Sequence, residues 1–499
     1  MLLAKQGFKV DVFERLPPLV DDEGNAQASI GPRSYNILLS ERAVAAMEAA
    51  GAEVSGFDVP NLRASLRHKL RGGPKEGTPS MPPGRSKVAN RGVLAGALVQ
   101  QCLAQHADRV QFHFEQELAA IDISNSAVYF KPVGSAAQGA AMASATAGAG
   151  GGCSGCASGE EGGGLGPVAV GRGGVAAAPP EALTQRRTPA SADALASYTF
   201  DLLVGADGAN STTRAVLQRY DPGLACRLKR DGMEFKTCVL GPAADFMPAD
   251  KGGVGTFQTW SNAKLQATLV GLSTDDGQLR CAFILPGGVH ATLRTAADYE
   301  AYLADAIPSL PKEAVQRAAP QLADCPISNG GTIVRCTKLN SHRAVLVGDA
   351  AHSVYPTLGQ GANAALEGAA MLAATLQEVG TDDMEAAAAE YSRRWLPNAL
   401  AVADLTEEGF GGNKRAYALN LKLLQLISQM LLHKLLPFLV PKPAFFQLNT
   451  TRMPFAVILQ RGKQELLVFK CILAAVVAAL AAALWRSVGR AALAAVGLA

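Results

Sequence analysis

The stretch from Arg343 to Ala369, RAVLVGDAAHSVYPTLGQGANAALEGA, constrains the fold more than any other part of this 499-residue chain. Apolar residues Ala344 to Val347 predict a short buried strand, since four consecutive apolar side chains suit a strand covered on both faces. Gly348 and Asp349 end that strand with a carboxylate at its carboxyl edge. A ligand bearing hydroxyl groups would suit such an acid.

A loop rich in proline and glycine follows this strand. Pro356, Gly359 and Gly361 shape the loop, and an Ala-rich helix is expected from about Asn363. The free backbone N–H groups at a helix start favour an electron-rich ligand group. An ordinary strand-loop-helix turn is the alternative, but the whole string favours a ligand site.

A second strand-turn-helix string, DLLVGADGANSTTR, occurs earlier in the chain. Leu202 to Val204 predict a buried parallel strand. Gly205, Asp207 and Gly208 predict a tight turn into a helix that starts near Ser211. Asp207 could contact a ligand or cap the helix, and both roles are compatible. Two such units predict an α/β fold with a parallel sheet.

The N-terminal segment carries a third signal. Phe8 to Phe13 alternates like a strand and ends at Glu14 and Arg15. In a dinucleotide-binding βαβ unit, an acid at the end of the second strand binds ribose hydroxyls, although a solvated surface acid is the alternative. We expect the first strand and its Gly-x-Gly-x-x-Gly loop before Met1, which would make the chain a fragment or one with a mis-assigned start.

Together these strings resemble the class A FAD-dependent aromatic monooxygenases (hydroxylases), in particular the kynurenine 3-monooxygenase branch. The GDAAH, P and GQG.N elements match in order, the N-terminus matches LAKxxFxVDVYExR, and RSYNILLS at Arg33 to Ser40 matches RSINLALS. The resemblance departs at Glu367, which is followed by Gly368 where the family has aspartate.

The resemblance implies FAD as cofactor and assigns groups of residues to it. Glu14 would bind the adenosine ribose, with Arg15 beside it as a further FAD contact, Leu38 would line the flavin, and Asp349 would bind the ribityl chain. The remaining implied FAD contacts are Arg91, Asp207, Gly208, Arg214, Gly348, Pro356, Gly359, Gly361, Ala362 and Asn363. Asp207 and Arg214 are implicated in NAD(P)H contact as well. An exposed helix-start arginine is the alternative for Arg91.

The implied activity is hydroxylation of an aromatic substrate with NADPH or NADH and O2, through a flavin C4a-hydroperoxide. The flavin carries the chemistry, so we expect no side-chain nucleophile and no metal. A flavoprotein epoxidase or reductase on the same fold is one alternative. A non-catalytic, membrane-tethered remnant is the other.

The substrate pocket is where the resemblance is weakest. An arginine, two tyrosines and an asparagine hold the substrate in the kynurenine branch, and the alignment places Ser65, Pro83, Phe445 and Gly409 there. A carboxylate in an apolar pocket would lack a partner, which predicts a more apolar substrate. Arg63 or Arg67 could substitute if the register slips by two. Phe410 and Phe445 could equally be core residues or walls of the pocket.

Composition limits the partners and the compartment. A net charge of +3 gives no nucleic-acid footprint, because such binding requires clustered Lys and Arg. The nine cysteines lack metal or disulfide spacing, which suits a reducing compartment. Cys153 and Cys156 form a CxxC without a second pair.

These signals predict an α/β protein: a Rossmann-like, three-layer FAD-binding domain with a parallel sheet lacking its first strand, an antiparallel-sheet substrate domain and a helical C-terminal region. The FAD-binding domain comprises residues 1–60 (truncated), 91–132, 199–225 (DG motif) and 331–405 (GD motif and helix); the substrate domain comprises 61–90 and 226–330; and the C-terminal helical region comprises 406–465. Residues 133–198 are rich in Gly, Ala, Ser and Pro, which predicts a disordered insertion in a β-hairpin.

The C-terminal end predicts membrane contact. Leu419 to Leu439 is strongly apolar and fits either a core helix pair or a membrane-surface helix. Leu466 to Trp485 has Lys470 as its only charge and is long enough to cross a bilayer as a helix, with a packed terminal helix as the alternative. We expect an intracellular membrane, such as the mitochondrial outer membrane or that of another organelle.

Overall fold

Parallel strand pairs form the framework of the first domain. The computed structural model describes residues 1–18, 35–53, 64–68, 70, 74–76, 86–133, 195–230, 232–247, 254–273, 276–408 and 416–495. Strand β1 (Val10–Phe13) pairs with β6 (Val110–His113), and β10 (Leu203–Gly205) pairs with β19 (Ala344–Leu346). All three side chains of β19 are buried, as its uninterrupted apolar sequence predicts.

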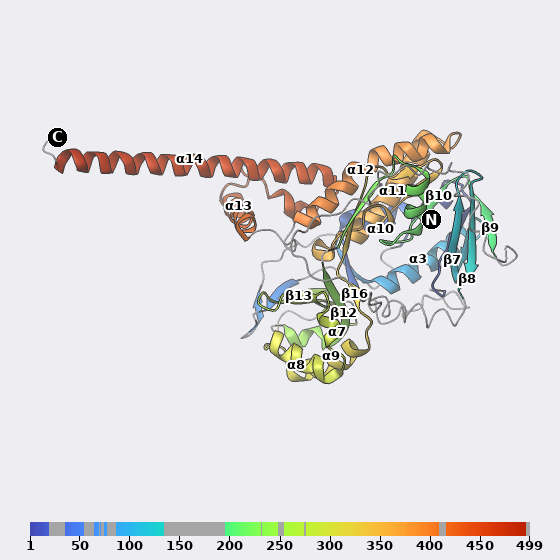
Figure 1. The fold of residues 1–499 in the computed structure, drawn as a ribbon, viewed down its shortest axis with the longest axis horizontal. Coiled ribbons are helices and arrows are strands. Elements are labelled where there is room, and N and C mark those ends of the chain that lie inside the picture. The colour runs from blue at the N-terminus through green and yellow to red at the C-terminus, as the bar shows by residue number, and fades with distance from the viewer. Residues whose placement is uncertain are drawn as a thin grey trace, which may run out of the picture.

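Helices cover these strands and bury several apolar clusters in the first domain (Figure 1). They are α1 (Leu2–Lys5), α2 (Glu41–Ala50), α3 (Arg91–His106), α6 (Thr212–Tyr220), α11 (Gly361–Val379) and α12 (Met384–Glu408). A smaller antiparallel sheet of β7 (Gln116–Asp122), β8 (Ala127–Pro132) and β9 (Ala196–Thr199) lies at one side. The sequence between β8 and β9 contains the predicted insertion, whose residues 134–194 are outside the described part of the chain.

An antiparallel sheet builds the second domain, below the first in Figure 1. In spatial order its strands are β16 (Ser328–Asn329), β12 (Met233–Pro242), β15 (Gln278–Pro286), β14 (Ala267–Ser273), β13 (Thr256–Asn262), β3 (Ala64–His68) and β4 (Pro74–Glu76). Only β3 joins its neighbour, β13, in parallel. Burial alternates along β15, because period-2 apolar residues place one face on a core.

Helices α8 (Ala296–Ala306) and α9 (Lys312–Asp324) cover that buried face. Helix α8 begins with a capping box, in which the Thr295 hydroxyl accepts from the Asp298 backbone N–H and the Asp298 carboxylate accepts from the Thr295 backbone N–H. The α/β architecture with an antiparallel second domain, predicted from the sequence, is therefore confirmed.

A two-stranded ribbon joins the domains. Strands β2 (Asn36–Leu39) and β5 (Lys87–Asn90) pair antiparallel beside β14. The buried Asn36 side chain donates to the Leu272 carbonyl at 2.8 Å, and Val88 packs against Leu272. This contact fixes the sheet of the second domain against the first.

The C-terminal region leaves the body of the molecule as a long helix (Figure 1). Helix α13 (Ala416–Leu435) is followed by a short 3-10 helix, η5 (Ala444–Gln447), and by α14 (Phe455–Ala495). The first turn of α14 is packed, with Phe455 and Ile458 buried, whereas the residues from Leu467 onward are largely exposed. Helix α14 is the one described helix that is long and apolar enough to cross a membrane.

Candidate functional site

The turn after β19 holds the central acid of the site. Gly348 has φ of +56°, a conformation that favours glycine, and its carbonyl accepts from the backbone N–H groups of Ala351 and His352 at 3.0 and 2.9 Å. This turn starts the short helix α10 (Asp349–His352) and places Asp349 at the carboxyl edge of the strand. Ligands of open parallel sheets bind at this edge.

Asp349 is a carboxylate for which the described part of the chain provides no hydrogen-bond partner. Desolvation raises its pKa above the usual range, and the charge of Arg91 offsets part of that effect. Within the described residues, no hydrogen bond or ion pair satisfies the carboxylate. The residue is exposed, so its carboxylate is accessible to a ligand that brings hydroxyl donors. The ribityl chain of FAD carries such hydroxyls, and in this respect the residues fit the cofactor.

Arg91 begins helix α3 near this acid. Its backbone N–H donates to the Tyr35 carbonyl at 3.1 Å, and its guanidinium carbon lies 6.0 Å from the centre of the Tyr35 ring. Asn90 caps the helix by accepting from the backbone N–H of Gly92 at 3.0 Å. The Arg91 side chain is exposed, and its positive charge acts on the carboxylate of Asp349.

The loop between α10 and α11 provides an open backbone surface. The 3-10 helix η4 (Pro356–Leu358) ends at Gly359, whose φ is +61° and where an added Cβ would have no neighbour within 4 Å. Helix α11 starts at Gly361 without a side-chain cap, and Ala362 is half-buried in its first turn. Free N–H groups therefore remain at this helix start.

Asn363 is fully buried, and its side chain links strand β2 to the loop before α11. Its side-chain nitrogen donates to the carbonyls of Leu38 at 3.0 Å and Gly359 at 2.7 Å, and its side-chain oxygen accepts from the Ser40 backbone N–H at 2.7 Å. The side chain thus fixes strand β2, with the predicted flavin-lining Leu38, against the loop. Direct contact of Asn363 with flavin stays a prediction.

The DG motif is hydrogen-bonded to helix α10. The Asp207 carboxylate accepts from the Ser211 hydroxyl and from the Thr213 backbone N–H at 2.8 Å, so it caps α6. The buried Arg214 guanidinium donates to the carbonyls of Ala350 at 2.7 Å and Ala209 at 2.6 Å. In the structure, both predicted cofactor residues have protein partners that position the two motifs.

Two further predicted residues extend beyond this cluster. Gly208 has φ of +82° and open space around its α-carbon. Glu14 follows β1, where its backbone N–H donates to His113 O at 2.9 Å and its carboxylate accepts from the Leu16 backbone N–H at 2.9 Å. Arg15 is exposed beside it. The place of Glu14 at the carboxyl end of a parallel strand matches the role predicted for it, which stays a prediction.

The buried cluster around Arg42 was not predicted from the sequence. The side chain of Arg42 is fully buried, bonds Glu367 at 2.6 Å, donates to the Met453 carbonyl at 3.0 Å and stacks over the Phe455 ring at 3.9 Å. Burial raises the pKa of Glu367 while Arg42 lowers it. The cluster ties α2 and α11 to the start of α14. Nothing in the local sequence indicates it, because the partners are far apart along the chain.

The position where the family pattern is broken also has a structural cause. A Cβ added to Gly368 would lie 2.8 Å from the indole nitrogen of Trp395, which itself donates to Nε2 of His352 at 3.0 Å. Burial lowers the pKa of His352 to about 4, so the ring is a neutral acceptor. The glycine makes room for the contact between α12 and α10, and the break in the GANAALEG string was the signal for it.

The substrate residues predicted by alignment are largely outside the described structure. Pro83, Gly409, Phe410 and Arg63 are not among the described residues. Ser65 and Arg67 lie on β3 and Phe445 on η5, but only their backbone is described. The pocket composition therefore stays a prediction.

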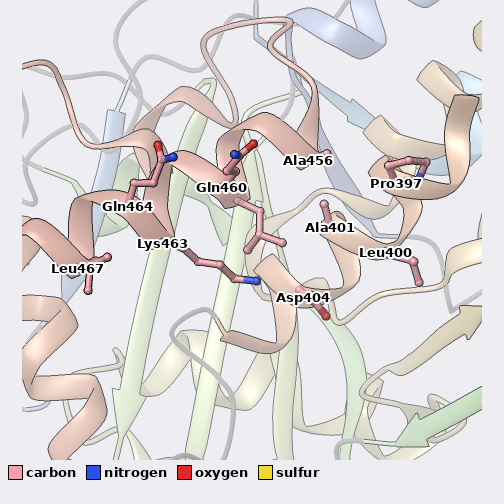
Figure 2. Close-up of a pocket in the computed structure, with 10 residues that line it drawn as sticks. Pro397, Leu400, Ala401, Asp404, Ala456, Gln460, Lys463, Gln464 and Leu467 are labelled. Carbon is pink, nitrogen blue, oxygen red and sulfur yellow. The ribbon is translucent and has the colours of Figure 1, made fainter.

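A cavity of about 430 Å³ opens between α12 and α14 (Figure 2). Its lining comprises Pro397, Leu400, Ala401, Asp404, Ala456, Leu459, Gln460, Lys463, Gln464 and Leu467. Because none of these residues belongs to the GD or DG motif, we do not assign the cavity to the cofactor.

Comparison with known proteins identifies the class. Residues 184–406 match the family model described as "FAD binding domain", a range that contains the DG and GD motifs. A kynurenine 3-monooxygenase of Salinispora arenicola is 26% identical over 479 residues, covering 93% of this chain and 88% of the relative. Another from Stenotrophomonas maltophilia is 31% identical over 225 residues, covering 42% of this chain and 45% of the relative.

Solved structures agree on the fold. The tetrameric form of 2-methyl-3-hydroxypyridine-5-carboxylic acid oxygenase has a TM-score of 0.56 at 16% identity and covers 90% of this chain and 91% of that one. PqsL of Pseudomonas aeruginosa, in complex with 2-aminobenzoylacetate, has a TM-score of 0.52 at 18% identity and covers 81% and 90%.

The fold and the two motifs define an FAD-dependent monooxygenase, and residues 184–406 match the FAD-binding domain of the class A aromatic monooxygenase family. Within that family, its relatives over nearly the full chain are kynurenine 3-monooxygenases. The resemblance inferred from the sequence, and the cofactor FAD, are thereby confirmed.

Proposed function

We propose that this enzyme is a membrane-attached, NAD(P)H-consuming monooxygenase that hydroxylates an aromatic substrate more apolar than kynurenine. The observation that carries the proposal is Asp349 at the carboxyl edge of β19, an accessible carboxylate whose pKa is raised by desolvation and which has no partner among the described residues. Arg91 and the Gly359 loop lie around the same edge.

Bound FAD supplies the redox chemistry, since it accepts hydride from a nicotinamide and passes electrons to O2. The residues of this chain position it. Asp349 would accept hydrogen bonds from ribityl hydroxyls, and the backbone N–H groups at the start of α11 would stabilise negative charge on the ring. Arg214 and Asn363 hold the surrounding loops in place.

The proposed substrate class rests on the alignment of the pocket. Ser65, Pro83, Gly409 and Phe445 stand where the kynurenine branch has polar groups that hold an amino acid. A carboxylate bound there would lose hydration without gaining a charged partner, which favours an apolar aromatic. Kynurenine itself is the competing substrate. It would be favoured if Arg63 or Arg67 took the place of the substrate-binding arginine.

Membrane attachment is supported by exposed apolar side chains. The segment Phe455–Arg486 of α14 is long and apolar enough to span a bilayer, and the 18-residue apolar window within it is not buried by the rest of the protein. On and after α13, the exposed large apolar residues are Leu424, Ile427, Met430, Leu431, Leu432, Leu435, Leu436, Phe438 and Leu439. This exposure favours the membrane-surface interpretation of α13 over a core helix pair. We place the enzyme on an intracellular membrane, such as the mitochondrial outer membrane.

Flavin content tests the cofactor site. The full chain is purified in detergent with added FAD, and bound flavin is measured by absorbance and fluorescence for wild type and Asp349→Ala, with the exposed Asp108→Ala as control. We expect flavin in the wild type and the control and a large loss in Asp349→Ala. The same measurement on a chain extended upstream through an in-frame glycine loop tests the implied pyrophosphate contact.

Product analysis tests the reaction. NADPH and NADH oxidation are screened with kynurenine and with apolar aromatics, and products are identified by mass. A hydroxylated apolar aromatic supports the proposal, whereas hydroxykynurenine overturns the substrate class. An epoxide or a reduced product would identify the alternative flavoprotein activity, and absence of flavin from every form would leave the remnant interpretation.

Vesicle flotation tests the attachment. We compare the full chain, a chain ending at Lys470, and that shorter chain with Leu431, Leu435 and Leu439 changed to serine. The shortened chain keeps the packed start of α14. Flotation should weaken on truncation and disappear with the serines. Equal flotation of all three would contradict attachment through these helices.

A further inference from the structure

Two cysteines face each other across neighbouring strands beside the GD motif. Strands β11 (Cys226–Arg230) and β17 (Thr332–Cys336) are antiparallel, and Cys226 is directly opposite Cys336. The Thr337 backbone N–H donates to the Ala225 carbonyl at 2.9 Å, which makes the adjacent cysteine pair a non-hydrogen-bonded one. Side chains are closest at such pairs, and here the two sulfur atoms are 2.6 Å apart.

The two thiols differ in access and in acidity. Cys226 is partly exposed, whereas Cys336 is buried. The hydrogen bond with Cys336, aided by the charge of Arg214, lowers the pKa of Cys226, and sharing that proton raises the pKa of Cys336. The thiolate is the reactive form of cysteine, so Cys226 is the nucleophile of the pair.

A second cross-strand pair in the same chain provides an internal comparison. Cys238 on β12 is directly opposite Cys281 on β15. Both are buried, and burial raises the pKa of Cys238 to about 12 and also raises that of Cys281. No sulfur–sulfur contact joins these two within the described residues. Opposite positions on two paired strands are therefore not enough to bring two cysteine sulfurs into contact.

We propose that Cys226 and Cys336 form a redox modification site, in which a peroxide oxidises Cys226 and Cys336 resolves it as a disulfide. The Cys226 thiolate attacks one peroxide oxygen, the O–O bond breaks, and water leaves after protonation. The Cys336 sulfur then attacks the resulting sulfenic acid, losing its proton and expelling a second water. Overall, two thiols and one hydrogen peroxide give one disulfide and two waters, with the sulfurs oxidised and the peroxide reduced.

The site is connected to the cofactor edge. The Cys336 thiol lies 3.4 Å from the carbonyl of Ala351 in α10, and Arg214 donates to Ala350 in the same helix. A disulfide would therefore link β11 to the strand that contacts the GD helix. We expect the oxidised protein to melt at a higher temperature, since the crosslink restricts the unfolded chain.

Thiol counting with peptide mapping tests the proposal. The full chain with Cys153, Cys156 and Cys471 changed to serine keeps six of its nine cysteines. Purified in detergent with FAD, it is treated with hydrogen peroxide, denatured and titrated. We expect six thiols to fall to four, a peptide that joins Cys226 to Cys336, and recovery of six with a reductant.

Single variants separate the roles. Cys336→Ser should stop at a sulfenic acid on Cys226 that a cyclic dione traps, whereas Cys226→Ser should lose no thiol under the same treatment. The double variant Cys238→Ser with Cys281→Ser should still form the disulfide. A crosslink between other cysteines, or dione labelling at Cys336 in place of Cys226, would overturn the assignment.

Discussion

The GD-motif core and the C-terminal arm of α13 and α14 have similarly apolar sequences but opposite surroundings. In the core, Val345 is 0% exposed and Trp395 is 1% exposed, whereas on the arm Phe438 is 100% and Trp485 is 81% exposed. The core buries its apolar groups within the protein, whereas the apolar groups of the arm are exposed on the protein surface and suit a lipid environment. Apolar content alone therefore does not identify a core helix.

The two regions meet at Arg42. This buried side chain joins Glu367 in the core to Met453 and Phe455, where the arm begins. Removal of one partner of a buried ion pair leaves an uncompensated charge. The junction is thus the most sensitive point in the comparison, and the predictions start there.

Arg42→Ala should break the junction with the largest effect. We expect a loss toward the lower end of about 3–5 kcal/mol in the free energy of unfolding, because the partly buried Glu367 loses its partner. Denaturant unfolding in detergent measures it. Arg393→Ala, which removes an exposed ion pair with Glu390, is the control and should change little. Equal effects of the two substitutions would contradict a special role of the junction.

Acid should weaken the core and leave the arm unaffected. Since the pKa of His352 is lowered to about 4 in the folded state, stability is retained above pH 6.5 and lost as the pH falls toward 4. The loss attributable to this histidine is about 3 kcal/mol. His352→Gln keeps an acceptor for Trp395 and should flatten the decline. Unfolding measured between pH 7 and 4 would show an unchanged slope if the histidine plays no part.

Asp349→Asn separates ligand binding from stability within the core. Loss of charged hydrogen bonds to FAD should cost about 1.5–3 kcal/mol, which corresponds to about 10-fold to 100-fold weaker binding. The raised carboxylate pKa means that the apoprotein is more stable in acid and loses that stability as the pH rises through the folded-state pKa. The variant should lack this loss near pH 7. Fluorescence titration with FAD measures the loss of affinity, and unfolding of the apoprotein measures stability. A variant apoprotein less stable than the wild-type apoprotein near pH 7 would refute the stability prediction.

A pair of glycines compares the regions directly. Gly368→Ala should destabilise by about 1–3 kcal/mol, because the new methyl meets Trp395 at 2.8 Å. Gly462→Ala, on α14 with no neighbour within 4 Å, should be neutral or slightly stabilising, since alanine favours helix. Thermal melts of both variants are the measurement. A neutral Gly368→Ala would show that Trp395 can move away freely.

The sequence by itself determined the local units. The helix from Glu41 to Ala50, closed by Gly51, has the bounds that apolar pattern and glycine predict, and Gly51 has φ of +80°. The apolar strand before Gly348 and the FAD class are likewise readable, because periodicity, turn residues and short motifs depend on neighbours along the chain.

Only the tertiary structure decided which distant residues meet. It paired Cys226 with Cys336, placed Trp395 against Gly368, and left the apolar face of α13 uncovered. It also gave Asp207 and Arg214 protein partners, although the motif pattern suggested cofactor contacts for both. Such outcomes depend on how complete elements pack. A local pattern records which side chains are apolar or charged, but it does not record what will lie opposite them.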